Sequence, residues 1–367
     1  MTTLTVSDRP ASDLKVDALV LATVKADSGA ALAPGHDLSK ATGEHLTNAL
    51  TALSAKGTPD EVLKLPAVPG VAAPLVVLTG LGAAPARGAA WDDEVLRRAA
   101  GSATRALSGV AKVALALPGA GAAAVGAVSE GALYGAYAFA GHRSQPAPST
   151  PPGALTVLTA EARDKDVKAA VKRAGALAEA RAYARDLVNT APNLLYPQTF
   201  ADSVRERAAK TDVKVSVLDD KALLKGGFGG IMGVGQGSAN PPRIVTMTYA
   251  PSKARAHIAF VGKGITFDSG GLCIKPPASM LTMKSDMAGA AAVAAAVLAA
   301  AELQLPVAVT GYLCLAENMP GGNAQRPGDV VTMRGGKTVE IIDTDAEGRM
   351  VMADGLVLAG EKKPDAI

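Results

Sequence analysis

The chain has 367 residues, 49% of them hydrophobic, which is enough to bury at least one full core and suggests two domains. The chain has 37 lysines and arginines and 34 acidic residues, and the basic residues form no dense run. The composition therefore does not indicate a nucleic-acid-binding surface. Two cysteines are too few for a disulfide framework, and the N-terminus lacks the basic-then-apolar pattern of a secretory signal, so we expect a cytoplasmic protein.

The first part of the chain alternates short apolar runs with helical stretches, which predicts an N-terminal α/β domain over residues 1–159. Its clearest helix is Asp92–Leu107, and its expected strands are Ala18–Val24, Leu75–Thr79, Val113–Leu117 and Leu155–Leu158. The segment Arg143–Gly153 is rich in proline and serine and predicts a surface loop or linker.

A long, alanine-rich and charged segment follows, and it predicts a linking helix over residues 160–190 that ends before Pro192. Beyond it, apolar runs again alternate with helical segments, one of them Thr199–Ala209. This pattern predicts a doubly wound α/β domain over residues 191–367 with a mainly parallel central sheet, whose loops at the strand ends form a site. The expected strands are Val213–Val217, Arg243–Tyr249, Ala256–Gly262 and Val307–Leu313.

Gly233–Pro242, GVGQGSANPP, contains a GxGxG pattern that resembles a dinucleotide-binding loop. Pro241 and Pro242 would block the helix whose N-terminus should bind pyrophosphate. We therefore interpret the segment as a tight structural turn.

Two later segments hold the residues of a candidate site. Val261–Met287 places lysines and aspartates among glycines, and we interpret it as a site rather than a core strand; Asp343–Met350, DTDAEGRM, adds a second cluster. The charged residues that we place in the candidate site are Lys263, Asp268, Lys275 and Asp286 in the first segment and Asp345, Glu347 and Arg349 in the second. Four carboxylates would balance two divalent cations, and such a metal pair activates a water for attack on a carbonyl or phosphoryl centre.

The elements beside these segments place the charged groups. Met287–Ala301 is too short for a membrane span and predicts a buried helix with Asp286 at its start. Thr338–Ile342 predicts a strand, and if the extended conformation continues, Asp345 and Glu347 point the same way. The predicted helix Gly348–Gly360 has Arg349 in its first turn, where free N–H groups favour a bound anion.

The same segments resemble the signature sequences of the leucyl aminopeptidase family of cytosolic dinuclear metallo-exopeptidases. Three more blocks resemble that family in the same order: Asn189–Ala201, Val234–Arg243 and Ala316–Val331. The resemblance is strong from about Arg185 onward and diffuse before it, and it makes residues 191–367 the expected catalytic domain.

The resemblance implies two divalent ions, Mn²⁺ or Zn²⁺, with peptides as substrates, a preference for leucine-like first residues and a homohexamer. The implied ligands are Lys263, Asp268, Asp286, Asp345 and Glu347, of which Asp268 and Glu347 would bridge the metals. Lys275 and Arg349 match the catalytic positions, the arginine holding a bicarbonate as general base. Met283 matches a position that lines the substrate side-chain pocket.

Asp343 stands where the family usually has asparagine, and Met350 replaces a usual leucine. Asn318 is expected near the site, either lining it or serving a structural role. The chain stops at Ile367 as a strand begins, so the sequence predicts a catalytic domain that is incomplete at its C-terminus.

Three alternatives remain open at this point. Mild basicity allows a DNA-binding or architectural role, alone or beside peptidase activity. Two metals also allow phosphoryl transfer, although the sequence has no phosphate-cradling loop. Arg349 could pair with Asp343 instead of holding an anion.

Overall fold

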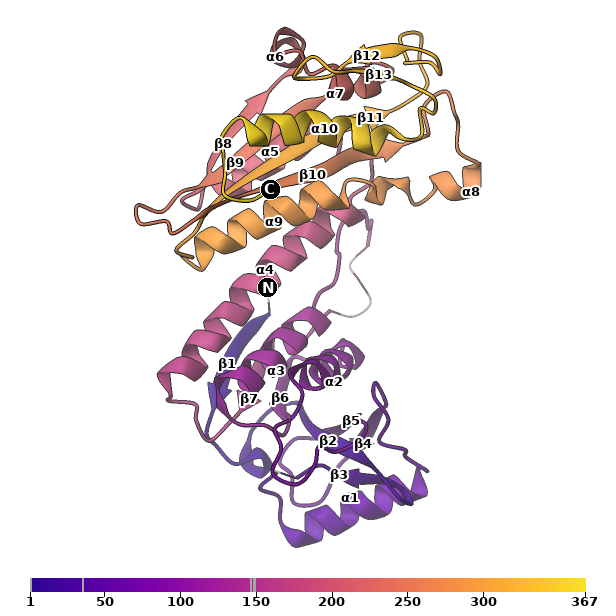
Figure 1. The fold of residues 1–367 in the computed structure, drawn as a ribbon. Helices are drawn as coiled ribbons and strands as arrows, with labels where there is room; N and C mark the ends of the chain where they lie inside the picture. The colour runs from indigo at the N-terminus through magenta and orange to yellow at the C-terminus, as the bar shows by residue number, and fades with distance from the viewer. Residues whose placement is uncertain (1, 35, 146, 148–149) are drawn as a thin grey trace. The chain divides into compact units, whose positions relative to one another are not determined.

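The computed structural model describes residues 2–34, 36–145, 147 and 150–367, which form two compact units, Met1–Glu179 and Ala180–Ile367 (Figure 1). The boundary between the units, after Glu179, falls within helix α4 (Lys165–Asn189), the long helix expected between the domains. The domain limits set from the sequence remain a prediction. In the predicted loop Arg143–Gly153, Pro146, Pro148 and Ser149 lie outside the described residues.

The first unit contains a seven-stranded sheet of order β1-β7-β6-β2-β5-β4, with β3 paired to β2. The neighbours from β1 through β5 pair in parallel, whereas β3 and β4 run antiparallel to their partners. The four strands expected here are confirmed as β2, β5, β6 and β7. The strands are β1 (Thr3–Ser7), β2 (Ala18–Ala26), β3 (Gly29–Leu32), β4 (Val62–Pro66), β5 (Leu75–Gly80), β6 (Lys112–Ala116) and β7 (Ala154–Leu158).

Helices cover both faces of this sheet. One face packs against α2 (Asp93–Ala106) and α3 (Gly121–Gly135), and the other against α1 (Lys40–Ala52); a short 3-10 turn, η1 (Ala11–Asp13), follows β1. Asp92 caps α2 because its side chain accepts hydrogen bonds from the backbone N–H groups of Glu94 and Val95.

The second unit is built on a four-stranded sheet of order β10-β11-β9-β8. β10 and β11 are parallel, and β9 runs antiparallel to both of its neighbours, so three of the four strands share one direction. The α/β class with an N-terminal and a second domain is thereby confirmed. The strands are β8 (Lys214–Leu218), β9 (Arg243–Tyr249), β10 (His257–Asp268) and β11 (Ala308–Asn318), with a separate hairpin of β12 (Val330–Thr332) and β13 (Thr338–Glu340).

The helices of this unit cover both faces of its sheet, as a doubly wound fold requires (Figure 1). One core packs α5 (Pro197–Ala208) and α9 (Ala288–Glu302) against β9 and β11. The other packs α6 (Asp220–Lys225), α7 (Gly229–Gly235) and α10 (Glu347–Gly360) against the opposite face. Two short pieces, α8 (Pro277–Met280) and η2 (Met283–Ser285), precede α9.

The buried alanine-rich helix is confirmed as α9. The stretch Pro277–Glu302 is long and apolar enough for a membrane span by length and composition alone. The structure divides it into α8, η2 and α9, and Ala290 and Ala294 are fully buried against the sheet. A Cβ on Gly262 of β10 would lie 2.7 Å from the Cα of Ala290, so the helix approaches the strand closely.

Two local predictions are wrong. Val261–Asp268 belongs to strand β10, so the segment interpreted as a site rather than a strand is both. Gly233–Gly235 end helix α7, and the turn begins only after them. In both cases tertiary packing, which the local pattern does not show, decides the conformation.

Candidate functional site

The site lies where β10 and β11 end side by side. Asp268 is the last residue of β10 and Asn318 the last of β11, and the two are register partners. The register shifts between Ile265 and Asp268. Such an irregularity turns a side chain out of the strand's regular alternation, and it precedes a carboxylate that is only 2% exposed.

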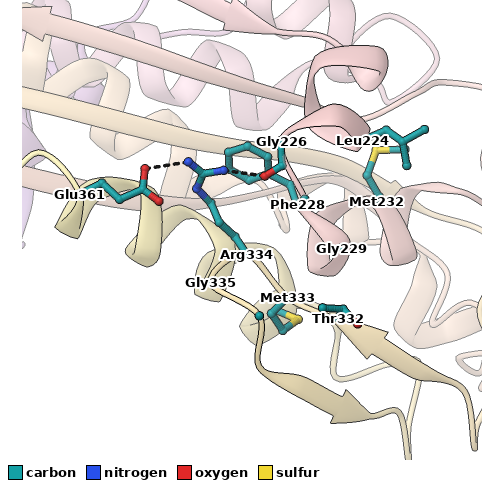
Figure 2. Close-up of a pocket in the computed structure, with 12 residues that line it drawn as sticks. Leu224, Gly226, Phe228, Gly229, Met232, Thr332, Met333, Arg334, Gly335 and Glu361 are labelled. Carbon is teal, nitrogen blue, oxygen red and sulfur yellow. Dashed lines mark hydrogen bonds and ion pairs between the residues drawn. The ribbon is translucent and has the colours of Figure 1, made fainter.

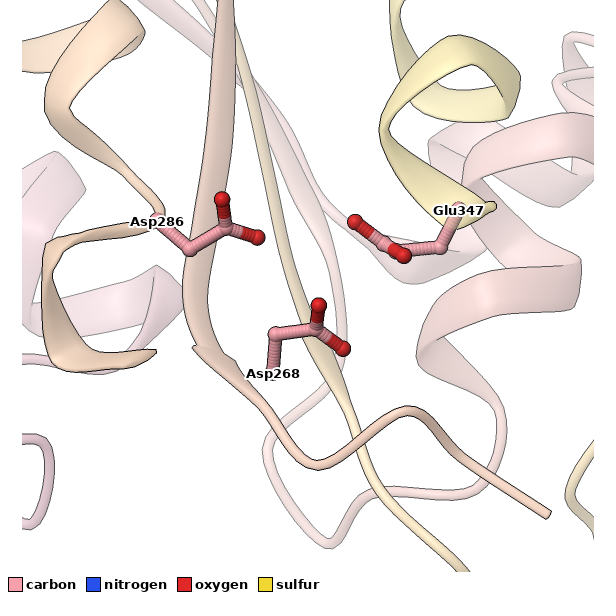
Figure 3. Close-up of side chains that lie close together, drawn as sticks. All are labelled: Asp268, Asp286 and Glu347. Atoms are coloured by element: carbon pink, nitrogen blue, oxygen red, sulfur yellow. The ribbon is translucent and has the colours of Figure 1, made fainter. Parts of the chain in front are cut away.

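Two further carboxylates approach Asp268 from other elements (Figure 3). Asp286 lies between η2 and α9, and Glu347 is the first residue of α10. One oxygen from each of Asp268, Asp286 and Glu347 lies within 4.8 Å of the other two. Three residues that the sequence placed in one site therefore do converge.

Lys263 lies between two of these carboxylates. Its Nζ is 2.8 Å from Asp286 Oδ2 and 2.8 Å from Glu347 Oε1. Burial works against the ammonium, but pairing with Asp286 and Glu347 outweighs it and raises the pKa of Lys263. Gly348 leaves room for this side chain, because a Cβ there would lie 2.7 Å from Lys263 Cδ.

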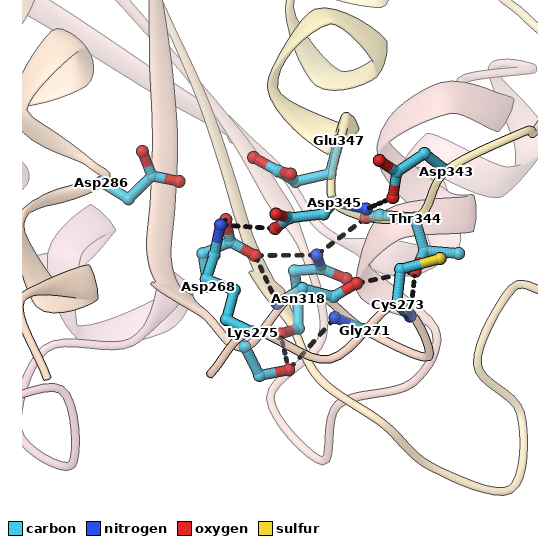
Figure 4. Close-up of polar contacts among 12 residues, drawn as sticks. Asp268, Gly271, Cys273, Lys275, Asp286, Asn318, Asp343, Thr344, Asp345 and Glu347 are labelled. Carbon is cyan, nitrogen blue, oxygen red and sulfur yellow. Dashed lines mark hydrogen bonds and ion pairs between the residues drawn. The ribbon is translucent and has the colours of Figure 1, made fainter. Parts of the chain in front are cut away.

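Lys275 links Asp345 to the cluster (Figure 4). Its Nζ is 3.0 Å from Asp268 Oδ2 and 2.5 Å from Asp345 Oδ1. Burial opposes the charge here too, but the two carboxylates raise the pKa of Lys275 above its usual range. The extended conformation expected through Asp345 and Glu347 is wrong: β13 ends at Glu340, Asp345 lies in a turn, and Glu347 begins a helix.

The cluster has the donor set of a divalent-metal site. Four carboxylates against two ammonium groups leave an excess of two negative charges. Burial raises the pKa of Asp286 and of Glu347 despite the nearby lysine. Glu347 Oε2 is buried and accepts no hydrogen bond from the described residues. Converging carboxylate oxygens, one of them without a partner, fit a hard divalent cation.

Uncharged groups connect the loops that carry these carboxylates (Figure 4). Asn318 Nδ2 donates to Asp268 Oδ1 at 2.8 Å and to the Thr344 carbonyl at 3.0 Å. The Thr344 hydroxyl donates to the Gly270 carbonyl at 2.6 Å and accepts from the Cys273 N–H at 2.8 Å. From the sequence, Asn318 is expected only near the site, and Thr344 was not predicted to take part in it. A hydroxyl between two aspartates of a charged motif was the available signal.

Arg349 lies in the first turn of a helix, as the sequence predicts, and Met283 lies in the short 3-10 piece η2. Arg349 is exposed in the first turn of α10, and no described residue forms an ion pair with it. Asp343, the alternative partner, instead accepts the backbone N–H of Asp345 at 2.8 Å. Met283 is partly exposed at the start of η2, which packs against β10.

A surface concavity of about 520 Å³ lies elsewhere in the second unit and contains none of these residues (Figure 2). Its main polar group is Arg334, whose guanidinium lies 4.2 Å above the Phe228 ring. The same group donates to the Gly226 carbonyl at 2.6 Å and pairs with Glu361 at 2.7 Å. Arg334 thus fastens the β12–β13 hairpin to the end of α10.

Comparison with known protein families finds two matching profiles. Residues 182–367 match "Cytosol aminopeptidase family, catalytic domain", and residues 20–146 match "Cytosol aminopeptidase family, N-terminal domain". The catalytic profile contains the whole carboxylate cluster.

Similar proteins span nearly the whole chain. The probable cytosol aminopeptidase of Streptomyces avermitilis is 53% identical, over 100% of this chain and 74% of that protein. Among solved structures, the bottromycin maturation enzyme BotP in complex with Mn has a TM-score of 0.78 at 36% identity, over 95% of this chain and 70% of that one. The cytosol aminopeptidase of Coxiella burnetii has a TM-score of 0.75 at 27% identity, over 99% of this chain and 71% of that one.

Proposed function

Because the chain belongs to the cytosol aminopeptidase family and is therefore a metal-dependent aminopeptidase, we propose that its cluster binds two divalent ions and hydrolyses the first peptide bond of peptides. The observation that carries this proposal is the approach of Asp268, Asp286 and Glu347 to within 4.8 Å of one another. Lys263 and Asp345 complete the proposed ligand set. Lys263 forms an ion pair with Asp286, and Asp345 is linked to Asp268 through Lys275.

Bound divalent ions would polarise the scissile carbonyl and lower the pKa of a water, so that the water can lose a proton and attack that carbonyl. Asp268, Asp286, Asp345 and Glu347 would hold the ions through their carboxylates. Lys263 can join them only as a neutral amine, so it must lose the proton that its pairing with Asp286 and Glu347 stabilises.

Two cationic side chains would act on the reacting groups. The Lys275 ammonium is held at the edge of the cluster by Asp268 and Asp345, where it can stabilise negative charge on the carbonyl oxygen during attack. We assign to Arg349 a bicarbonate ion, since a guanidinium fork fits a planar anion and the start of α10 offers free N–H groups. The bound anion would supply the general base.

Substrate choice, metal and assembly form the finer part of the proposal. Met283, partly exposed beside Asp286, would contact the first side chain of the substrate, and we propose a leucine-like preference. Mn²⁺ is the first candidate because BotP was solved with Mn, and Zn²⁺ is the second. We also propose a homohexamer in the cytoplasm. The comparisons lend no support to a DNA-binding role or to phosphoryl transfer.

The test is hydrolysis of leucine p-nitroanilide by the full chain, with metal content measured on the same samples. We expect activity after reconstitution with Mn²⁺ or Zn²⁺ and its loss with a chelator. Asp345→Asn should lose metal and activity together, because one anionic ligand is removed from a set that balances two dications. Retained turnover with a full metal complement in Asp345→Asn would refute the ligand assignment.

The native metal is identified separately. Elemental analysis of protein purified without added ions, followed by reconstitution with each ion, should show whether Mn²⁺ or Zn²⁺ restores activity. If protein from which all metal has been removed is as active as the reconstituted enzyme, the proposed function as a whole is contradicted.

A further inference from the structure

The loops that carry the carboxylates are joined through one buried hydroxyl. Thr344 is 0% exposed, and its hydroxyl is used as both donor and acceptor. Both partners, Gly270 and Cys273, belong to the loop between Asp268 and Lys275, whereas Thr344 itself precedes Asp345. A single side chain therefore connects the loop after β10 to the turn before α10.

Asn318 makes a second connection from a third element, strand β11. Its side-chain amide donates to Asp268 and to the Thr344 carbonyl. The backbone carbonyl of Asn318 accepts the N–H of Ser269 at 3.0 Å and the Ser269 hydroxyl at 2.8 Å. The side chain is 2% exposed, so water does not substitute for these contacts without rearrangement.

The loop also packs tightly against both residues. Gly271 has a φ of +64°, and a Cβ at this position would lie 2.9 Å from Asn318 Oδ1 and 3.1 Å from Thr344 Oγ1. A side chain here would have to push the two polar groups away. The backbone at Gly271 thus packs directly against the side chains of Asn318 and Thr344.

We propose that Thr344 and Asn318 are positioning residues that fix the distance between the two metal-binding loops, an inference that rests on the proposed function. Asn318 Nδ2 and the Gly270 N–H both bind Asp268 Oδ1, which leaves Oδ2 directed to Lys275 and the cluster. Donors behind a ligand orient it, and their loss typically lowers metal affinity by about 10–100-fold.

The central variant is Thr344→Val, which keeps the shape and removes the hydroxyl. Thr344→Ser keeps the hydroxyl and is the conservative rescue. Thr79→Val is the matched control, because the Thr79 hydroxyl is likewise 0% exposed and donates to the Ala99 carbonyl at 3.1 Å in the other compact unit.

Mn²⁺ affinity is measured by titration calorimetry on the full chain, and thermal unfolding is measured without metal. Thr344→Val should bind Mn²⁺ about 10–100-fold more weakly than wild type. Thr344→Ser should bind close to wild type, and Thr79→Val should lose stability but not affinity. If Thr344→Val does not fold, Thr344→Ala, which removes the same hydroxyl without placing a methyl against the Gly270 carbonyl, is expected to show the same loss.

Three outcomes would overturn the inference. Wild-type affinity in Thr344→Val, with a melt shifted as in Thr79→Val, would show that the hydroxyl contributes to folding alone. A loss of affinity in Thr344→Ser equal to that in Thr344→Val would show that the hydroxyl is not the cause. If wild type itself binds no Mn²⁺ or Zn²⁺, the proposed function fails as well, a result distinguishable from the other two because no variant is needed to see it.

Discussion

Each lysine of the site lies between two carboxylates that belong to different segments of the chain. Lys263 joins Asp286 to Glu347, and Lys275 joins Asp268 to Asp345. These ion pairs join the segments of the chain that carry the anionic groups. A metal ion and the Lys263 ammonium cannot share the same oxygens, so loading requires the lysine to give up a proton.

At the same scale, Arg349→Ala tests the anion site. The variant should keep both metals but lower kcat by about 100-fold, since a positioned general base is lost. Added bicarbonate should stimulate bicarbonate-depleted wild type more than the variant. The melting temperature should hardly change, because Arg349 is exposed and no described residue pairs with it.

Arg349→Lys is the control for charge, as it keeps the cation without the planar fork. Its response to bicarbonate should fall between those of wild type and Arg349→Ala. Equal stimulation of all three proteins, or of none, would count against the assignment.

The two cysteines should differ in reactivity. Cys314 is fully buried, and burial, with Asp354 nearby, raises the pKa of its thiol to about 12, so it carries no thiolate near neutral pH. Cys273 is half-buried in the loop before Lys275. Iodoacetamide at pH 8 should therefore label only Cys273 in the native chain and both thiols after unfolding, as counted by mass spectrometry. Labelling of Cys314 in the folded protein would contradict its burial.

At the scale of elements, η2 is fastened to the end of α4. Lys284 Nζ donates to the Asn189 carbonyl at 2.8 Å, and Lys284 lies between Met283 and Asp286. Lys284→Met keeps the stem of the side chain and removes the donor. It should raise KM for leucyl substrates by about tenfold, the equivalent of one charged hydrogen bond of ~1.5 kcal/mol. Steady-state kinetics check this.

Lys284→Arg should restore most of the affinity, because a guanidinium can also donate to the carbonyl. A fall in kcat at unchanged KM would instead place Lys284 in the chemistry rather than in substrate positioning.

Sequence reasoning predicted elements well where one pattern determines them. The apolar runs that became β2 and β5 were recognisable because burial on both faces of a strand favours a continuous run of apolar residues. The direction of β9 was not predicted, since a strand's residues do not record which way its neighbour runs. The last residues of helix α7, Gly233–Gly235, were expected to belong to a turn because Pro241 and Pro242 follow them and block a continuing helix.

Packing explains why the first residue of helix α7 is a glycine. A Cβ on Gly229 would lie 1.9 Å from the Thr332 carbonyl oxygen, so this close approach of α7 to β12 admits no side chain.

In the site, the charged residues were predictable from their clustering in two motifs. Their pairing was not, because spacing along the chain does not say which amine meets which carboxylate across loops.

For the whole molecule, metal should stabilise one unit selectively. All proposed ligands lie in Ala180–Ile367, whereas the single tryptophan, Trp91, packs against the core of the other unit. Saturating Mn²⁺ at 100 times its Kd should stabilise the second unit by ~2.7 kcal/mol. Calorimetry should show one transition moving upward on Mn²⁺ addition while the Trp91 fluorescence transition stays in place. An equal shift in both signals would show that the units unfold as one.

The outer edge of β10 has a further consequence for handling the protein. β10 is the last strand of its sheet, and among the described residues only Ala366 bridges to its outer side, at Ile258. Phe260 is 41% exposed just beyond that bridge. In a chain of these 367 residues, this edge and its exposed apolar residue form a template on which a further strand can pair. Self-association should therefore depend on this one strand. Light scattering should increase with protein concentration, and Phe260→Lys should suppress the increase. Unchanged scattering in that variant would show that another surface causes the association.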